Sequence, residues 1–383
     1  MDERGRTRIS RTGLNKPGSF LRQRSLEDGS AGAESAGPAA QQPGGGAGAS
    51  AAAGPAAVDM SRRAPSRSVQ LTRRLGLVIF GLAVIALFSG LSPGAFFTHG
   101  TLITVITAES IPMMLALAVT ITLRLHDLDV SFAAIMILTA SIAGELLVAN
   151  HVSLAVAIIV ALAMGLLAGL INGFLVVVLK LSSFIATLGT MSVAEGLALS
   201  VSHSTILTGF PAAFTNDMQN GPGGVPLGAI IGWVLLLVLW LAFEYTPFGR
   251  YLLFIGGNRT AAELLGLPVR RVRIIAYAVT GILYAAAGIV LAGMLGSVDP
   301  TSDATFLLSP LAAAFLGTTV FQLGRFNAWG TAVSVYVLAA ISTGLQILGA
   351  SAWVGDVFEG AALILAIALS RFLSKSSEVD LNL

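Results

Sequence analysis

The sequence predicts an all-α, polytopic membrane protein with about ten transmembrane helices, both termini in the cytoplasm, and a disordered tail before the first helix. Three observations predict this class. Of the 383 residues, 55% are hydrophobic and only 11% are charged, and the mean hydropathy is +0.83. Long apolar runs alternate with short polar breaks from Leu75 onward. The positive charges that follow Arg74 fall only in alternate breaks, as expected for cytoplasmic loops.

Residues 1–74 differ in composition from the rest of the chain. They are rich in Gly, Ala, Ser, Pro and Arg and hold few large apolar residues. Such a segment buries too little surface to offset the entropy of ordering, so we expect a disordered cytoplasmic tail. The first apolar run starts too far from the N-terminus for a cleavable signal peptide. An arginine cluster precedes that run: Arg62, Arg63, Arg67, Arg73 and Arg74.

Residues 75–371 form the predicted transmembrane domain, and residues 372–383 form a short cytoplasmic C-terminal tail. A spanning helix needs roughly 20 apolar residues. The fifth predicted segment is rich in Ser and Thr and is also compatible with a half-helix, and the eighth and tenth are short. The ten segments lie near 75–92, 102–123, 132–149, 152–179, 183–202, 228–245, 272–295, 304–321, 328–349 and 354–371.

The distribution of charge sets the predicted orientation. With the N-terminus inside, the predicted outer loops hold no Lys or Arg, and every positive charge falls on the cytoplasmic side. The longest outer loop, His203 to Leu227, is rich in Gly, Pro and Asn. It fits either a docking surface for an extracytoplasmic protein or a plain solvated loop.

Several function classes find no support in the sequence. The chain has no cysteine, so disulfides and thiolate metal sites are impossible, and its four histidines lack ligand spacing. No G-x-x-x-x-G-K-[ST] phosphate loop occurs. No nucleophile–base constellation is visible either. We therefore expect a protein that is not an enzyme, binds no metal or cofactor itself, and does not bind nucleic acid.

The cytoplasmic loop 246–273 contains a short helix of its own. Thr260 and Glu263 have the spacing of a capping box, in which each side chain bonds the backbone N–H of the other. Gly266 suits a left-handed C-terminal cap, and Pro268 stops the helix. A helix this short is unstable alone and exposes Leu264 and Leu265, so it must dock. It lies either on its own protein or on a cytoplasmic partner, which it would bind less well if Thr260 and Glu263 were replaced.

Small residues and buried acids stand out within the predicted spans. In the fourth span a small residue recurs every fourth position, which predicts close helix packing inside the bundle: Ala161, Gly165, Gly169 and Gly173. Shorter stripes occur at Gly281 and Ala285 and at Gly330 and Ser334. The acids are Glu109, Glu145, Glu195 and Glu359. Glu195 falls near mid-membrane, where a charge is costly. It is either a pathway or interface residue or a carboxyl satisfied within the bundle.

At these positions the sequence resembles the permeases of bacterial ABC importers of the ribose, xylose and galactose type. The most specific match is TPFGRYLLFIGGN-x-x-A-A-x-x-x-G-L, from Thr246 to Leu267. The other matching stretches are Leu128-Asp-Val-Ser131, Gly169-Leu-Ile-Asn-Gly173, Ser183-Phe-Ile-Ala-Thr-Leu-Gly-Thr-Met191, and Leu316-Gly-x-Thr319 with Gly324-Arg325. The resemblance covers residues 75 to 371, in the family's order and spacing.

The resemblance implies a multi-pass subunit of the bacterial plasma membrane whose dimer forms a pore for a sugar-like solute. A solute-binding protein would deliver the solute, and a separate ATPase would hold ATP and Mg²⁺. The residues implied to couple to the ATPase are Gly257, Asn258, Arg259, Thr260, Ala261, Ala262, Glu263, Leu264, Leu265 and Gly266. Those implied to line the pathway or an interface are Asn172, Phe184, Thr187, Thr190 and Glu195.

The sequence departs from the family pattern at several points. His126-Asp127 stands where the family usually has Gly-Gly, and Glu195 stands where it usually has Arg. These departures leave open the solute and whether the subunit pairs with itself or with a different permease. A branched-chain amino-acid or nucleoside permease is the first alternative. A secondary transporter or channel, which needs no ATPase, is the second.

Overall fold

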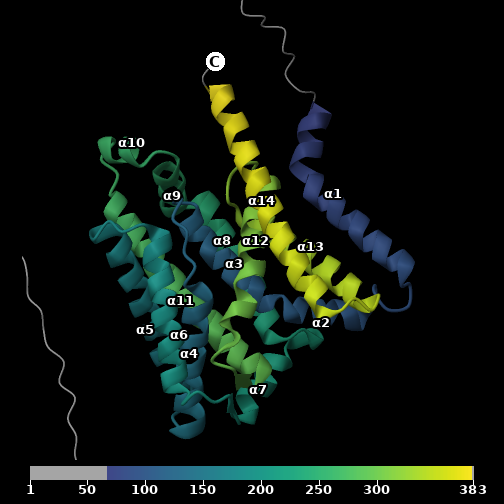
Figure 1. Ribbon diagram of the computed structural model, residues 1–383, viewed down its shortest axis with the longest axis vertical. Coiled ribbons are helices and arrows are strands. Elements are labelled where there is room, and N and C mark those ends of the chain that lie inside the picture. The colour runs from purple at the N-terminus through teal and green to yellow at the C-terminus, as the bar shows by residue number, and fades with distance from the viewer. Residues whose placement is uncertain (1–66, 382–383) are drawn as a thin grey trace, which may run out of the picture. The chain divides into compact units, whose positions relative to one another are not determined.

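The computed structural model describes residues 67–381, so most of the predicted tail lies outside the described residues. The described chain is helical almost throughout, as the all-α prediction requires (Figure 1). Its longer helices are α1 (Arg67–Leu91), α2 (His99–Ala108), α3 (Ser110–Leu123), α4 (Phe132–Gly144), α5 (Leu154–Gly173), α6 (Ser183–Val201), α7 (Ala212–Gln219), α8 (Leu227–Tyr245), α9 (Pro247–Gly257), α10 (Arg259–Leu264), α11 (Val269–Leu295), α12 (Leu308–Leu316), α13 (Ala328–Ile347) and α14 (Ala352–Leu381).

Each of the ten predicted segments overlaps a helix, but the count of ten spans is not confirmed. Among the described residues, six helices are long and apolar enough to cross a membrane. They are α4, α5, α6, α8, α11 and α13 with their terminal turns. The pair α2 and α3 would add a seventh span, bent by 42° at the break between them. The fifth predicted segment is a complete helix of 19 residues rather than a half-helix.

The predicted span over 304–321 is not confirmed, because the segment is not one continuous α-helix. A 3₁₀ turn over Ser302–Phe306 leads into α12, which has nine residues, and a second 3₁₀ turn over Gly317–Thr319 follows it. Nine residues rise about 14 Å, roughly half of the hydrocarbon thickness. The Asn327 side chain donates to the carbonyls of Gly317 and Val320, at 3.0 and 3.1 Å. These bonds hold the chain in a turn, and no local sequence pattern reveals a partner seven to ten residues away.

Helices α3 and α4 form the centre of the bundle. All residues of α3 except Pro112 are buried, and so are all residues of α4 except Ile142. Helices α8, α11, α12 and α13 pack on α3, while α5, α6 and α11 pack on α4. The connection between the two central helices, residues 124–131, therefore runs through the interior and must satisfy its backbone there.

The small-residue stripe predicted in the fourth span is a packing surface, as expected. Ala161, Gly165, Gly169 and Gly173 are all buried on α5, which lies along α11. A Cβ at Gly165 would meet the carbonyl of Gly281, and one at Gly169 would meet that of Tyr277. The two backbones approach each other so closely that neither glycine leaves room for a side chain.

One end of the bundle is closed by the long loop His203–Leu227. The Gly, Pro and Asn residues of this loop predict turns, yet the loop also contains α7, which packs on α11 through Phe214 and Met218. A two-residue strand β1 (Leu207–Thr208) pairs antiparallel with β2 (Ser297–Val298). These contacts tie two loops that are distant in sequence into one cap.

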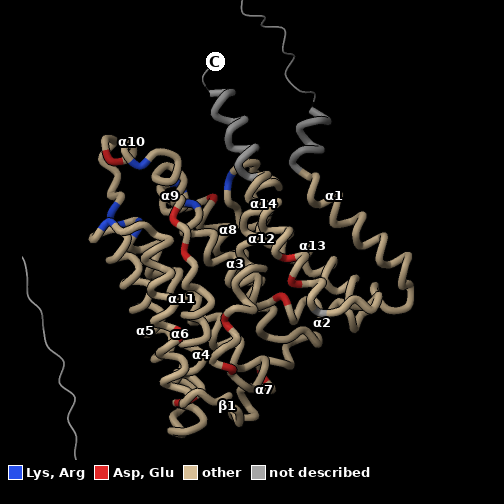
Figure 2. The backbone as a smooth tube through the Cα atoms, viewed as in Figure 1, with Lys and Arg blue, Asp and Glu red and all other residues tan. Residues whose placement is uncertain are grey.

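The opposite end of the bundle carries the positive charge. Figure 2 shows Lys and Arg gathered where α9 and α10 lie, whereas the end with α7 and β1 shows none. We call the first the basic end. Its described cations include Arg124, Lys180, Arg250, Arg259, Arg270, Arg271, Arg273 and Arg325. This separation matches the charge pattern read from the sequence.

Candidate functional site

The short helix α10 starts two residues earlier than the capping box predicts. Asn258 is its N-cap, with extended backbone and a side-chain oxygen that accepts from the N–H of Ala261 at 2.9 Å. Thr260 lies inside the helix, so the predicted Thr260–Glu263 capping box is wrong. Asn caps helices at least as well as Thr, and an earlier start adds two residues to a helix of only six.

The predicted end of α10 is confirmed. Gly266 adopts the left-handed conformation, with φ of 76°. Its N–H donates to the carbonyl of Glu263, and the N–H of Leu267 donates to that of Ala262, both at 3.0 Å. These two bonds make a Schellman motif, after which Pro268 prevents the helix from continuing. Helix α10 is therefore fixed at both ends by its own chain.

Helix α10 presents two leucines to the surroundings. Leu264 is 86% exposed and Leu265 is 77% exposed, whereas Ala262 is buried. Ala262 packs with residues of α9 and α11, so the helix lies on its own protein by one face only. The other face is an apolar surface that nothing in the described chain covers.

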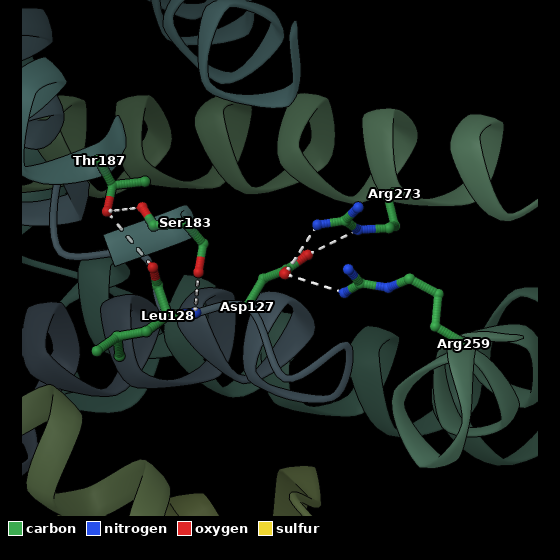
Figure 3. Close-up of polar contacts among 6 residues, drawn as sticks. All are labelled: Asp127, Leu128, Ser183, Thr187, Arg259 and Arg273. Carbon is green, nitrogen blue, oxygen red and sulfur yellow. Dashed lines mark hydrogen bonds and ion pairs between the residues drawn. The ribbon is translucent and has the colours of Figure 1, made fainter. Parts of the chain in front are cut away.

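A buried carboxylate joins α10 to the interior of the bundle. Asp127 accepts hydrogen bonds from Nε and Nη2 of Arg273, each at 2.9 Å, and one from Nη2 of Arg259 at 3.3 Å (Figure 3). Arg259 is the first residue of α10, and Arg273 lies in the first turns of α11. The side chains of Asp127 and Arg273 are buried, while that of Arg259 is 43% exposed.

The two ion pairs of Asp127 differ in strength. The pair with Arg273 is bidentate and buried, and removing one partner of such a pair costs about 3–5 kcal/mol. The pair with Arg259 has one contact near solvent, and pairs of that kind contribute at most about 1 kcal/mol. Arg273 therefore fixes the carboxylate permanently, whereas Arg259 can exchange it for water or another partner when α10 moves.

Helix α6 holds the chain that follows Asp127. The N–H of Leu128 donates to Oγ of Ser183 at 3.1 Å (Figure 3). The N–H of Val130 donates to Oγ1 of Thr187 at 3.2 Å. Thr187 in turn donates to the Ser183 carbonyl at 2.8 Å. Two side chains one turn apart on α6 thus satisfy backbone donors that no helix or strand pairs.

A second buried carboxylate completes the connection. One oxygen of Asp129 accepts from the N–H and the hydroxyl of Ser131, at 2.9 and 2.6 Å, and the other accepts from the hydroxyl of Tyr284 at 3.1 Å. Asn172 of α5 donates to the Ser131 hydroxyl at 2.8 Å. Burial raises the pKa of Asp129, and these hydrogen bonds oppose that rise. Residues of α5, α6 and α11 therefore meet on one short segment.

The structure divides the five predicted pathway residues into two groups. Asn172 and Thr187 are buried in the polar cluster around residues 127–131. Phe184 is exposed on α6, while Thr190 and Glu195 are half-buried there. Thr190 donates to the Ala186 carbonyl at 3.0 Å. Their role in a pathway stays a prediction.

Neither Asp127 nor Arg273 is predicted from the sequence to have a role. His126-Asp127 stands out there only as a departure from a family pattern. The position of Asp127 between two apolar segments could have indicated a role, because an acid there needs a cationic partner. Its partner is 146 residues away, so only the fold identifies it.

Among the described residues, no group of three or more His, Asp or Glu side chains is arranged to hold a metal ion. The placement of ATP and Mg²⁺ on a separate subunit stays a prediction.

A bundle with several helices long and apolar enough to cross a membrane defines a multi-pass membrane protein. Residues 101–367 match the family described as the branched-chain amino acid transport system / permease component, and the chain belongs to that family.

Curated relatives cover most of the chain. The ribose import permease of Bacillus subtilis is 34% identical over 294 residues, which is 76% of this chain and 91% of the relative. The D-allose transport system permease of Escherichia coli is 26% identical, over 83% of this chain and 97% of the relative. The autoinducer 2 import permease of Yersinia pseudotuberculosis is 30% identical, over 66% and 78%.

Proposed function

We propose that this chain is the transmembrane permease subunit of an ATP-driven importer that carries a sugar or sugar-like solute across the bacterial plasma membrane. The relatives named for ribose and D-allose import support the solute class. The match over residues 101–367 supports the role of permease. Both termini and the basic end would lie in the cytoplasm, because positive charge is retained there.

The observation that carries the proposal is α10 itself. It is capped at both ends, rests on Ala262, and exposes Leu264 and Leu265. A single polar helix with an apolar face, fixed at a membrane surface, is suited to seat in a groove of another protein. The proposed occupant of that face is an ATPase subunit, which binds ATP and Mg²⁺.

Two routes would pass the motion of the ATPase into the bundle. The first is covalent, since α10 leads through Pro268 directly into α11. The second is the Arg259–Asp127–Arg273 contact, which links α10 to the connection between α3 and α4. Alternating access would follow if α11 and the central helices move together when two ATPase subunits close. A second permease chain, identical or different, would complete the pathway, and a binding protein would deliver the solute outside.

Reconstituted vesicles test this function. The chain is co-expressed with a candidate ATPase subunit and a candidate solute-binding protein, and uptake of labelled ribose and related sugars is measured with ATP. Leu264→Asp should abolish ATPase retention and uptake while leaving membrane insertion intact. Ile206→Asp, an exposed apolar residue in the His203–Leu227 loop, is the matched control and should retain the ATPase. Uptake that needs no ATPase would contradict the proposal.

A branched-chain amino acid is the second candidate solute, because the matching family is that of branched-chain amino acid transport permeases. The same vesicles distinguish the two solutes when labelled leucine replaces the sugar.

A further inference from the structure

A hollow of about 690 Å³ lies beside α10 at the basic end. Its walls come from the end of α9, one side of α10, the end of α3, and the connection between α12 and α13. The lining residues that matter for its chemistry are Arg124, His126, Phe254, Leu265 and Arg325. No Asp or Glu lines it, so it is a cationic hollow flanking the exposed leucines.

Arg124 lines the hollow, and one of its hydrogen-bond donors has no acceptor. It is the C-cap of α3 and only 6% exposed. Its Nε donates to the Phe326 carbonyl at 2.8 Å, and its guanidinium lies 3.9 Å from the centre of the Phe243 ring. Its Nη1 has no acceptor. A buried donor without a partner costs about 1–3 kcal/mol, so an added acceptor would stabilise this arrangement.

Arg124 stays positively charged at neutral pH. Burial lowers its pKa to about 10, and the neighbouring Glu244 opposes that shift. Glu244 does not line the hollow, and its Oε1 accepts from Nε2 of Gln322 at 2.8 Å. The positive charge inside the hollow is therefore not paired by an acid from its own walls.

Arg325 also lines the hollow, and a hydrogen bond to its backbone carbonyl holds it in place. Its carbonyl accepts from Nδ2 of Asn327 at 3.2 Å, and the same amide fixes the carbonyl of Val320. Gly324 before it has φ of 73°. The backbone at Arg325 is thus set by the turn, while its side chain is exposed. A cation presented on a fixed backbone binds with less loss of entropy than one on a loose loop.

The rim of the hollow is apolar on the side of α9 and α10. Phe254 is 60% exposed and Leu265 is 77% exposed. A ligand that fits this hollow must therefore carry apolar groups near the rim and a negative charge inside. A Glu or Asp side chain that projects from a protein surface has this composition. The exposed leucines of α10 lie beside the hollow and extend the same interface.

We propose that this hollow receives an acidic side chain of the ATPase subunit, so that the ATPase is held at two points: by Leu264 and Leu265 on α10, and by Arg325 and Arg124 through a carboxylate. This inference rests on the proposed function. The charge of the hollow and its continuity with the exposed face of α10 favour this partner. The carboxylate would accept from the unpaired Nη1 of Arg124 and from Arg325.

Charge reversal at Arg325 tests the proposal in the full complex. Arg325→Glu should weaken retention of the ATPase about tenfold, because one charge-assisted contact becomes repulsive. Arg325→Lys should keep most of it. Arg271→Glu is the matched control, because Arg271 is an exposed cation on α11 that lines no such hollow. Retention by the wild type should fall as salt increases, and retention by Arg325→Glu should respond less.

A second step identifies the partner residue. Single Asp or Glu residues of the ATPase are changed to Arg, and one of these should restore retention of Arg325→Glu. If Arg325→Glu keeps wild-type retention while Leu264→Asp loses the ATPase, the inference fails and the proposed function stands. If neither variant changes retention, both fail. If Arg325→Glu instead loses only its binding to phosphatidylglycerol vesicles, the occupant is a lipid phosphate and the inference is overturned.

Discussion

The carboxylate of Asp127 binds the guanidinium of Arg273 through two hydrogen bonds of 2.9 Å, although 146 residues separate them. This contact joins the connection between the central helices α3 and α4 to the start of α11. Arg259 at the start of α10 shares the same carboxylate. The described chain thus links its exposed helix to its most buried segment through one acid.

Asp127→Asn tests the strength of this contact. The substitution keeps the shape but leaves Arg273 buried without a counter-charge, so we expect a loss of about 3–5 kcal/mol in the free energy of unfolding. Thermal unfolding in detergent measures it. Arg259→Gln is the comparison and should cost at most about 1 kcal/mol, because its pair is near solvent. Equal effects of the two variants would mean that the buried pair is not the stronger one.

Asn258→Ala tests the cap that replaces the predicted one. Loss of an N-cap costs about 1 kcal/mol, and in α10 this should appear as faster amide hydrogen exchange within residues 259–265. Thr260→Ala should change exchange little, since its side chain bonds nothing in the cap. If Thr260→Ala loosens the helix and Asn258→Ala does not, the observed start of α10 is incorrect.

Gly266→Ala probes the left-handed turn at the other end of α10. Neither Gly266 nor Gly257 has an atom within 4 Å of an added Cβ, so the two differ only in backbone conformation. At Gly266 the positive φ should cost about 1–2 kcal/mol and speed local exchange. Gly257→Ala is the control, at a glycine without positive φ. Similar exchange in both variants would exclude backbone strain as the reason for glycine here.

Gly169→Ala tests the packing of α5 on α11. Its Cβ would strike the backbone of Tyr277, which cannot move without displacing α11. We expect a loss of about 1–3 kcal/mol and a lower unfolding temperature. Gly189→Ala, on α6 with open space around it, should cause no loss. Retained stability in Gly169→Ala would show that the two helices lie further apart than described.

Patterns that are local in sequence predicted most of the fold. The apolar run near 228–245 corresponds to α8 at 227–245, and the four-residue repeat from Ala161 to Gly173 forms part of the buried face of α5. Gly266 and Pro268 marked the end of α10. Each of these features depends on neighbours within one or two turns, which a single sequence displays.

Features that depend on distant residues could not be predicted in the same way. Asn327 binds the carbonyls of Gly317 and Val320, which lie ten and seven residues before it. Ser183 and Thr187 appeared as motif residues on α6, yet they support the backbone of residues 128–130. These partners are 55 and 57 residues apart in the sequence, so only the packed helices bring them together.

The central claim is that α10 faces the cytoplasm and binds the ATPase, and one thiol tests both parts. The chain has no cysteine, so Leu264→Cys creates a unique site. We predict that a membrane-impermeant maleimide labels it only in inside-out vesicles, and that bound ATPase blocks the labelling. Asp217→Cys on α7 should label only from outside. Labelling of Leu264→Cys in intact cells, or labelling that the ATPase does not reduce, would contradict the account.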